Sequence, residues 1–170
     1  MSQIVYVVLA SGSLTREGFV SVFELIDGVS PLARVAQALG EREAFVVVPP
    51  ERIDIACRQA PLALTIVNDQ PDRGLSYSLK VALAALPADR NFAILYGDVP
   101  LRTDRLERLE NAFTDETDVV YPIDGVNPGY PVLFSARARA IVATLADGDT
   151  IDQARDHADL RHVAVPSQQA

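Results

Sequence analysis

The sequence predicts one α/β domain built on a doubly wound, mostly parallel sheet with helices on both faces. The chain has 170 residues, the size of one domain, and 49% of them are apolar. Apolar runs without alternation, which are typical of strands buried on both faces, are separated by segments of helical periodicity. No internal repeat, linker or low-complexity tract interrupts this pattern, so we expect a single domain over residues 1–170.

The strands are predicted from short apolar runs rich in β-branched residues. They cover residues 4–9, 44–48, 62–67, 92–96, 118–121, 132–134 and 160–165. Helices are predicted between them, over residues 31–39, 51–58, 75–86, 103–113, 135–145 and a short stretch after residue 149. Short polar side chains that accept bonds from the first free amides are expected as N-caps at Ser30, Thr103, Ser135 and Asp149.

Composition excludes several classes of protein. The formal net charge is −8 and the chain has no basic stripe with interleaved aromatic residues, so nucleic acid is not an expected partner. No apolar run approaches the roughly 18 residues that span a bilayer, and no signal peptide is expected. The only cysteine, Cys57, excludes an internal disulfide and is expected to fill core space on a helix. These features predict a cytoplasmic protein.

The most informative stretch is the buried strand that ends at Tyr96 and continues as Gly97-Asp98-Val99-Pro100. Gly97 permits a sharp turn, so the carboxylate of Asp98 is expected at the carboxyl end of a central strand, where open α/β sheets bind ligands. Such an acid suits a hard cation such as Mg²⁺ together with substrate phosphates. The alternative is that Asp98 only caps a turn or the following helix.

Two further segments could receive a phosphorylated ligand. The loop after the first strand is rich in small residues, so its backbone amides could close around a phosphate, and Arg16 adds a forked donor. It is neither a dinucleotide-binding fingerprint nor a Walker A loop, so a plain strand-to-helix loop is the alternative. The helix that opens at Gly74 could receive polar groups at its amino end, although Ser76 or Ser78 could equally be only a helix cap.

These segments follow one another in a recognisable order. They are Leu9-Ala10-Ser11-Gly12-Ser13-Leu14-Thr15-Arg16-Glu17-Gly18, Gly74-Leu75-Ser76-Tyr77-Ser78-Leu79, Gly97-Asp98-Val99-Pro100, Gly129-Tyr130-Pro131-Val132-Leu133 and Gly148-Asp149. Taken together, they resemble the signature segments of the MobA-like nucleotidyltransferase family, most closely its molybdenum-cofactor cytidylyltransferase branch. The resemblance extends over nearly the whole chain.

This resemblance implies transfer of a nucleoside monophosphate from CTP or GTP to a phosphorylated acceptor such as molybdopterin, with Mg²⁺ as cofactor and pyrophosphate as product. Arg16 and Asp98 are implied as catalytic residues, with Asp98 also holding the metal. The nucleotide is implied to lie against Leu9, Ala10, Ser11, Gly12, Ser13, Asn68, Gly74 and Ser76. The acceptor is implied to lie against Gly129, Tyr130 and Pro131.

The chain also departs from the family pattern. The loop lysine of the family is replaced by Ser21, which removes a charge-assisted contact to a polyanion. Glu17 adds a negative charge beside the expected polyphosphate, and Tyr130 replaces a His or Asn on the acceptor side. Relatives carry an Asp-x-Asp-Thr-Pro segment that supplies a second metal ligand. This chain has no counterpart of it before Pro166, and Asp149 or Asp152 could supply the second ligand instead.

Two other functions are therefore open on the sequence. A catalytically impaired relative would bind a nucleotide or phosphorylated metabolite, or act as an interaction module, as the loss of the lysine at Ser21 suggests. A sugar transferase of similar architecture would carry Asp-x-Asp after a central strand, which Asp98-Val99-Pro100 does not match.

Overall fold

The computed structural model describes residues 3–11 and 21–167. Its strands are β1 (Ile4–Leu9), β2 (Ala44–Val48), β3 (Leu64–Val67), β4 (Asn91–Tyr96), β5 (Val119–Asp124), β6 (Asn127–Pro128), β7 (Val132–Phe134) and β8 (His162–Pro166). Its α-helices are α1 (Pro31–Leu39), α2 (Ile53–Gln59), α3 (Leu75–Ala85), α4 (Thr103–Ala112), α5 (Arg139–Ala143) and α6 (Ile151–Arg155). Short 3-10 turns cover Pro50–Arg52, Pro71–Arg73 and Ala136–Ala138.

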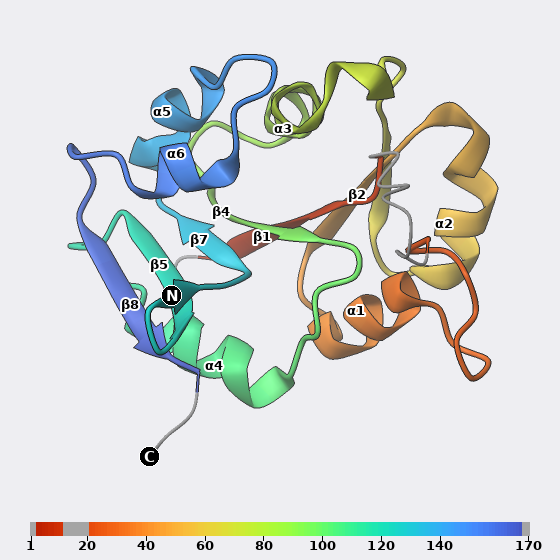
Figure 1. Ribbon diagram of the computed structural model, residues 1–170, viewed down its shortest axis with the longest axis horizontal. Helices are drawn as coiled ribbons and strands as arrows, with labels where there is room; N and C mark the ends of the chain where they lie inside the picture. Colours follow the sequence, from red (N-terminus) through yellow and green to blue (C-terminus); the bar gives the residue numbers. More distant parts are fainter. Residues whose placement is uncertain (1–2, 12–20, 168–170) are drawn as a thin grey trace.

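The strands form one mixed sheet in the order β3-β2-β1-β4-β7-β5-β6, and β8 pairs with β5 (Figure 1). Strands β1 to β4 are parallel to one another, whereas β7 runs antiparallel between β4 and β5. β8 is parallel to β5. The predicted doubly wound, mostly parallel sheet is therefore confirmed, with β7 as an antiparallel strand inside it.

Helices cover both faces of the sheet (Figure 1). The side chains of α3, α5 and α6 pack on one face, and those of α1, α2 and α4 pack on the other. Strand β4 contributes to both layers, because Phe92 and Ile94 face the first and Ala93 and Leu95 face the second, all with no exposed area. Burying a large apolar side chain contributes about 1.5–3 kcal/mol, so β4 anchors the turn that follows it.

The predicted start and end of α1 are confirmed. The Ser30 Oγ accepts a hydrogen bond from the Ala33 amide over 3.0 Å, Pro31 occupies the first turn, and Gly40 ends the helix with φ of +59°. Leu32, Val35 and Leu39 share the buried face, as their spacing predicts.

Three other predicted capping bonds do not form. Arg102 is the N-cap of α4, and Thr103 is its first helical residue. Ser135 does occupy the N-cap position of the turn Ala136–Ala138 that leads into α5, but its hydroxyl donates to the buried Asp118 carboxylate over 2.9 Å and forms no capping bond. At α6 the N-cap is Thr150, which forms a capping box with Gln153. At α4 and α6 a neighbouring residue takes the N-cap position, and at Ser135 a distant carboxylate takes the hydroxyl.

The interpretation of Cys57 as core filler is also wrong. Cys57 lies on α2 as expected, but its side chain is exposed, with Sγ 3.4 Å from the Thr65 Oγ1. The buried face of α2 carries Ala56 instead. Consecutive helical residues point about 100° apart, so the residue next to the buried position turns away from the sheet.

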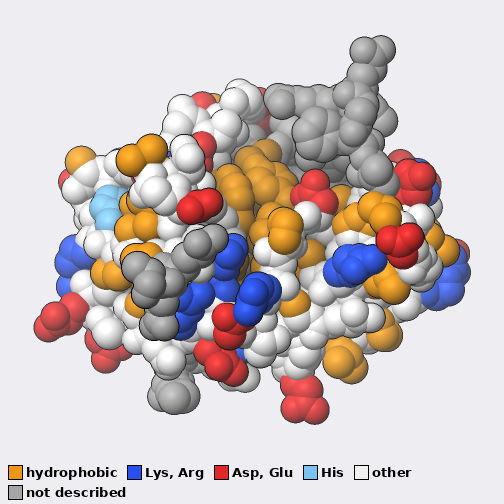
Figure 2. All heavy atoms as spheres, turned by 60° about the horizontal axis from the view of Figure 1, so that its bottom comes forward, with side chains coloured by type: hydrophobic (Ala, Val, Ile, Leu, Met, Phe, Trp, Pro, Cys, Tyr) orange, Lys and Arg blue, Asp and Glu red, His pale blue; other side chains and the backbone are white. Residues whose placement is uncertain are grey.

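No helix among residues 3–11 and 21–167 is both long enough and apolar enough to cross a bilayer. Figure 2 shows the face that includes α1 and α4, where basic side chains are interspersed with acidic ones around a central group of hydrophobic side chains.

Candidate functional site

The carboxyl ends of β1 and β4 lie side by side. Leu9 pairs with Tyr96 at the last position of the parallel ladder, and the Gly97 amide donates to the Leu9 carbonyl over 3.0 Å. The next amide on β1, that of Ala10, donates to Val47 on β2 over 2.9 Å. The two loops that carry the predicted site residues therefore leave the sheet at the same edge, next to each other.

Gly97 is closely surrounded at this edge. A Cβ atom placed on it would lie 3.4 Å from two side-chain carbons of Val22 and 3.6 Å from the Ala10 Cβ. Asp98 follows in a turn closed by the Val99 amide and the Tyr96 carbonyl over 3.2 Å, and its side chain is exposed. The carboxylate forms no hydrogen bond or ion pair with any described residue. Because α4 is capped at Arg102, Asp98 is not a helix cap.

A buried polar cluster supports the loop ends behind this edge. The Ser78 Oγ on α3 lies 2.6 Å from the Ser11 Oγ and accepts a hydrogen bond from the Asn68 Nδ2 over 2.9 Å. The Asn68 Oδ1 accepts from the Gln70 amide over 2.8 Å, so both polar ends of this side chain are occupied. Ser11 and Asn68 therefore hold β1, β3 and α3 in register, and what they can offer a nucleotide is backbone.

The amino end of α3 is open in the described residues. Gly74 occupies the N-cap position with φ of +83°, a left-handed conformation that favours glycine, and no side chain caps the helix. The Ser76 hydroxyl is buried and donates to the Asp147 carboxylate over 3.4 Å, so the interpretation of Ser76 or Ser78 as a cap is wrong. The first amides of a helix lack intrahelical partners and attract anionic groups.

Two tyrosines meet next to this turn: Tyr96 is the last residue of β4, and Tyr130 precedes β7. The rings of Tyr96 and Tyr130 meet edge to face with centroids 5.0 Å apart. Burial, followed by the charge and hydrogen bond of Tyr96, raises the pKa of the Tyr130 phenol. Burial also raises the pKa of Tyr96, and the negative charges of Asp152 and Asp98 add to that effect. Both carboxylates therefore act on the same phenol.

The Asp152 carboxylate is held by a buried arginine. Arg155 is 5% exposed, and its Nη1 donates to the Asp152 Oδ1 over 2.6 Å while its Nε donates to the Asp156 Oδ1 over 2.8 Å. Its guanidinium lies over the Tyr121 ring at 5.3 Å from the centroid. Asp152 is half exposed, and only its Oδ1 is bound by Arg155 among the described residues.

The predicted residues thus fall into three groups. Leu9, Ala10, Ser11 and Asp98 meet at the β1 and β4 ends; Asn68, Gly74 and Ser76 surround the start of α3; and Gly129, Tyr130 and Pro131 precede β7. Gly12, Ser13 and Arg16 lie outside the described residues. Sequence reasoning missed Tyr96 and Arg155; the three-residue spacing of Asp152 and Arg155 on a short helix was the available signal.

The described side chains offer few ligands for a divalent cation. Among the described residues, no group of three or more potential metal ligands is present. One or two carboxylates that hold a cation together with substrate phosphates are the usual protein share of a Mg²⁺ site. Asp98 is exposed and carries only oxygen ligands, so it fits such a site.

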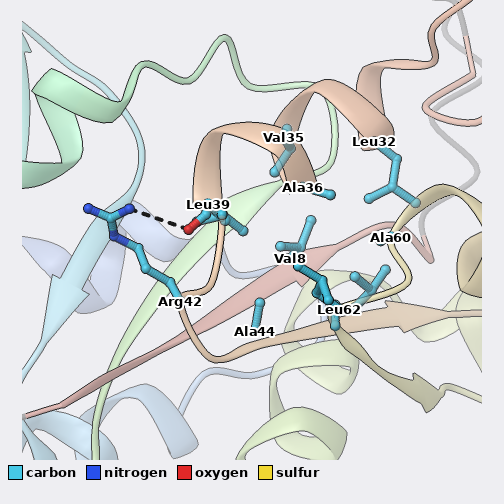
Figure 3. Close-up of a pocket in the computed structure, with 12 residues that line it drawn as sticks. Val8, Leu32, Val35, Ala36, Leu39, Arg42, Ala44, Ala60 and Leu62 are labelled. Carbon is cyan, nitrogen blue, oxygen red and sulfur yellow. Dashed lines mark hydrogen bonds between the residues drawn. The ribbon is translucent and has the colours of Figure 1, made fainter.

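Two hollows in the described residues lie away from this edge. One is lined mainly by apolar side chains of α1, β1, β2 and the turn before β3, with about 300 Å³ of space that is partly open to solvent (Figure 3). The Arg42 guanidinium at its margin donates to the Leu39 carbonyl and forms an ion pair with Glu110. The other is lined by Asn91, Ser135 and Arg137 at the opposite end of β4. Neither contains a predicted site residue.

Comparison with known structures shows a shared α/β fold. Rv0371c from Mycobacterium tuberculosis H37Rv superposes with a TM-score of 0.76 and 23% identity, over 98% of this chain and 90% of that one. A manganese complex of the same protein superposes with a TM-score of 0.75. A nucleotidyl transferase from Methanothermobacter thermautotroptrophicus superposes with a TM-score of 0.75 and 21% identity, over 99% and 89% of the two chains.

The family is shown by the sequence. The MobA-like NTP transferase domain model matches residues 6–164, and the chain belongs to this family. The resemblance noted on the signature segments is therefore confirmed.

Characterised proteins of similar sequence are longer. The bifunctional protein GlmU of Cellvibrio japonicus is 26% identical over 160 residues, which is 91% of this chain and 35% of GlmU. GlmU of Chromobacterium violaceum is 33% identical over 118 residues, 66% of this chain and 26% of GlmU. The chain thus spans about a quarter to a third of the length of these relatives.

Proposed function

We propose that this chain transfers a nucleoside monophosphate from CTP or GTP to a phosphorylated acceptor, with molybdopterin as the first acceptor to try. The observation that supports the proposal is the hydrogen bond from Gly97 to Leu9, which joins the end of β1 to the turn that carries Asp98. Family membership supplies the reaction class. In this reaction an acceptor phosphate oxygen forms a bond to the α-phosphorus, the bond from that phosphorus to the bridging oxygen breaks, and pyrophosphate leaves.

The chain's contribution to this reaction is alignment and neutralisation of charge, because no covalent intermediate is needed. The Ser11 backbone and the open amides of α3 would bind the nucleotide next to Leu9 and Ala10, with the buried Ser11, Asn68 and Ser78 cluster fixing their positions. The rigid β1 and β4 ends hold these groups in place before the nucleotide arrives.

Asp98 would hold Mg²⁺, and we infer that Asp152 is the second carboxylate. Both acids considered on the sequence are bonded nearby, Asp149 to the Ala146 amide over 2.7 Å and Asp152 to Arg155 over 2.6 Å. Of the two, Asp152 is the one whose negative charge helps to raise the pKa of Tyr96, as Asp98 also does. Bound between these acids, the cation would offset the charge of the triphosphate. Gly129, Tyr130 and Pro131 would face the acceptor.

A catalytically impaired relative that binds a nucleotide is the second candidate, and one observation favours it. The Ser21 Oγ accepts a hydrogen bond from the Phe23 amide over 3.3 Å within its own turn, where the family carries a lysine. A neutral, locally bonded side chain cannot replace the charge-assisted contact of that lysine, which contributes roughly 1.5–3 kcal/mol. Arg16 would then be the main cation on this loop.

Isothermal titration calorimetry with CTP, GTP and ATP distinguishes the two candidate functions. Each nucleotide is titrated with and without Mg²⁺ into the wild type and into Asp98→Asn. Tight binding of one nucleotide that needs Mg²⁺ and is lost in Asp98→Asn supports the transferase. Asp89→Asn is the matched control, because Asp89 is also exposed and lies in the loop before β4, at the opposite end of that strand.

The remaining outcomes of the titration also distinguish the two candidate functions. Binding that is indifferent to Mg²⁺ and to Asp98→Asn favours the impaired relative. Failure of all three nucleotides to bind would overturn both proposals. A radiolabelled transfer assay with molybdopterin, scored by pyrophosphate release, then tests the acceptor separately from the nucleotide.

A further inference from the structure

Strand β3 lies at a free edge of the sheet. In the described ranges it pairs only with β2, in register from Leu64 opposite Phe45 to Val67 opposite Val48. Beyond this ladder, the backbone of Leu64–Val67 forms no hydrogen bond with a described residue. Every second amide and carbonyl group along β3 therefore points outward without a protein partner, which is the geometry that adds a further strand.

The edge is apolar and carries no charge. Residues 60–67 form eight consecutive uncharged positions in a chain in which 22% of residues are charged. Leu62, Leu64 and Val67 are 75%, 63% and 40% exposed. Natural edge strands are protected by a lysine, an inward-pointing charge, a bulge, a proline or a short length. β3 is only four residues long, but no charge or proline lies between Leu62 and Val67.

The apolar surface continues past the strand. Leu62 and Ala63 precede β3 and also line the hollow under α1, where Figure 3 places Leu62 and Ala60 opposite Val8. The outer side of α2 next to β3 carries the exposed Cys57, whose Sγ lies 3.4 Å from the Thr65 Oγ1. The exposed region thus includes the strand edge, the preceding turn and one side of α2.

We propose that this edge pairs with β3 of a second copy of the chain, antiparallel across a two-fold axis. Each copy carries a formal charge of −8, so two copies repel one another except where they meet over a neutral surface, and residues 60–67 provide one. A two-fold interface is self-complementary, which an edge strand satisfies by pairing with itself. This inference is independent of the proposed function.

The charges at the ends of β3 select the antiparallel arrangement. Arg58 precedes the strand and Asp69 follows it, and both are exposed. Neither forms an ion pair with a described residue, and Asp69 receives only a 3.4 Å hydrogen bond from the Tyr77 hydroxyl. Antiparallel pairing brings Arg58 of one copy toward Asp69 of the other, whereas parallel pairing brings like charges together, which is unfavourable.

The size of the surface limits the affinity. A stable interface buries about 800 Å² on each partner, which four strand residues do not supply alone. The turn at Leu62 and the exposed side of α2 must contribute, so we expect a dimer that dissociates on dilution. Apolar contact with a few central side chains should then carry most of the binding.

The first test is light scattering after size exclusion over a concentration series, on the wild type, Leu64→Lys and Val126→Lys. The proposal expects a wild-type dimer, loss of the dimer in Leu64→Lys, and wild-type behaviour of Val126→Lys, which places the same charge on another exposed apolar residue. Circular dichroism on each variant checks folding. A wild-type monomer, a dimer that survives Leu64→Lys, or a dimer lost equally in Val126→Lys would overturn the proposal.

The second test reverses the end charges and does not depend on Leu64. Arg58→Asp and Asp69→Arg should each raise the dissociation constant of the dimer by about tenfold. The double variant should restore the wild-type value, because each reversed charge meets its reversed partner on the other copy. A double variant that remains as weak as the single variants would exclude the antiparallel arrangement.

Discussion

Ser11 and Ser78 are separated by 67 positions in the sequence, yet their hydroxyl oxygens lie 2.6 Å apart in the core. Their contact ties the end of β1 to the first turns of α3, and Asn68 joins the same hydroxyl from the end of β3. Three segments that surround the candidate nucleotide site are thus fixed by one buried oxygen.

Removing that oxygen should destabilise the protein. In Ser78→Ala the Asn68 Nδ2 loses its partner in a fully buried position, and an unsatisfied buried donor costs about 1–3 kcal/mol. Urea unfolding monitored by circular dichroism measures the change. Ser76→Ala is the matched control: Ser76 is also buried on α3, but its only side-chain hydrogen bond is the 3.4 Å contact to Asp147. Equal effects of the two substitutions would contradict this role of Ser78.

The turn after β4 should tolerate a methyl group but not a branched side chain. In Gly97→Ala the new Cβ meets Val22 carbons at 3.4 Å, which a small shift of Val22 accommodates. In Gly97→Val the added methyl groups have no such space, and overpacking of this kind costs about 1–3 kcal/mol. We expect Gly97→Val to lower the free energy of unfolding and to weaken nucleotide binding, since Asp98 moves with the turn. Unfolding and calorimetry on both variants test this, and a Gly97→Val protein as stable as Gly97→Ala would refute it.

A second, half-buried cluster predicts a pH dependence of stability. The Tyr6 hydroxyl donates to the Glu110 Oε1 over 2.6 Å, and Arg42 donates to both carboxylate oxygens over 2.7 and 3.1 Å. Burial raises the pKa of Glu110, but the bonds from Arg42 and Tyr6 outweigh it and hold this pKa below its ordinary value of 4.5. The ionised carboxylate therefore stabilises the fold above pH 4.5, and the stabilisation is lost as the pH falls through the lower, folded-state pKa.

Glu110→Gln should therefore cost about 1–2 kcal/mol near neutral pH, and the difference from the wild type should shrink in acid. Unfolding in urea across an acid-to-neutral pH series measures it. Glu107→Gln on the same helix is the control, because Glu107 is exposed and surface substitutions change stability by only about 0.5 kcal/mol. A difference that grows as the pH falls would have the wrong sign for this explanation.

Substitutions of Asp152, on α6, and of Asp149, in the turn before it, should differ in their effect on the Mg²⁺ dependence of nucleotide binding. Asp152→Asn removes a charge that reaches Tyr96 and Tyr130, so we expect a higher Mg²⁺ concentration for half-maximal nucleotide binding, by about tenfold. Asp149→Asn changes an acid that is bonded within its own turn and should leave that concentration unchanged. Calorimetric titration of CTP and GTP at several Mg²⁺ concentrations measures both. An equal shift in the two variants would remove Asp152 from the site.

Local patterns predicted most of the elements correctly. The bounds of β1, β2 and α1 match the predicted ranges, because continuous apolar runs and a Ser-Pro start with a Gly end are strong local signals. The predicted capping bonds at Thr103, Ser135 and Asp149 do not form: α4 begins one residue earlier, after Arg102, and Thr150 takes the N-cap position of α6 from its neighbour Asp149. Ser135 went to the Asp118 carboxylate, 17 positions away, which local spacing does not reveal.

The sequence alone determined the order of strands and helices, the apolar faces that pack into the core, and the family. These features depend on periodicity and on short motifs. Only the tertiary structure decided which polar side chains stay exposed and which are bonded inside. Asn68 and Ser11 look alike as ligand-binding residues in the sequence, but they are buried partners of Ser78, whereas Asp98 remains exposed. The physical reason is that a polar group in the core must find a partner, and that partner comes from distant positions in the chain.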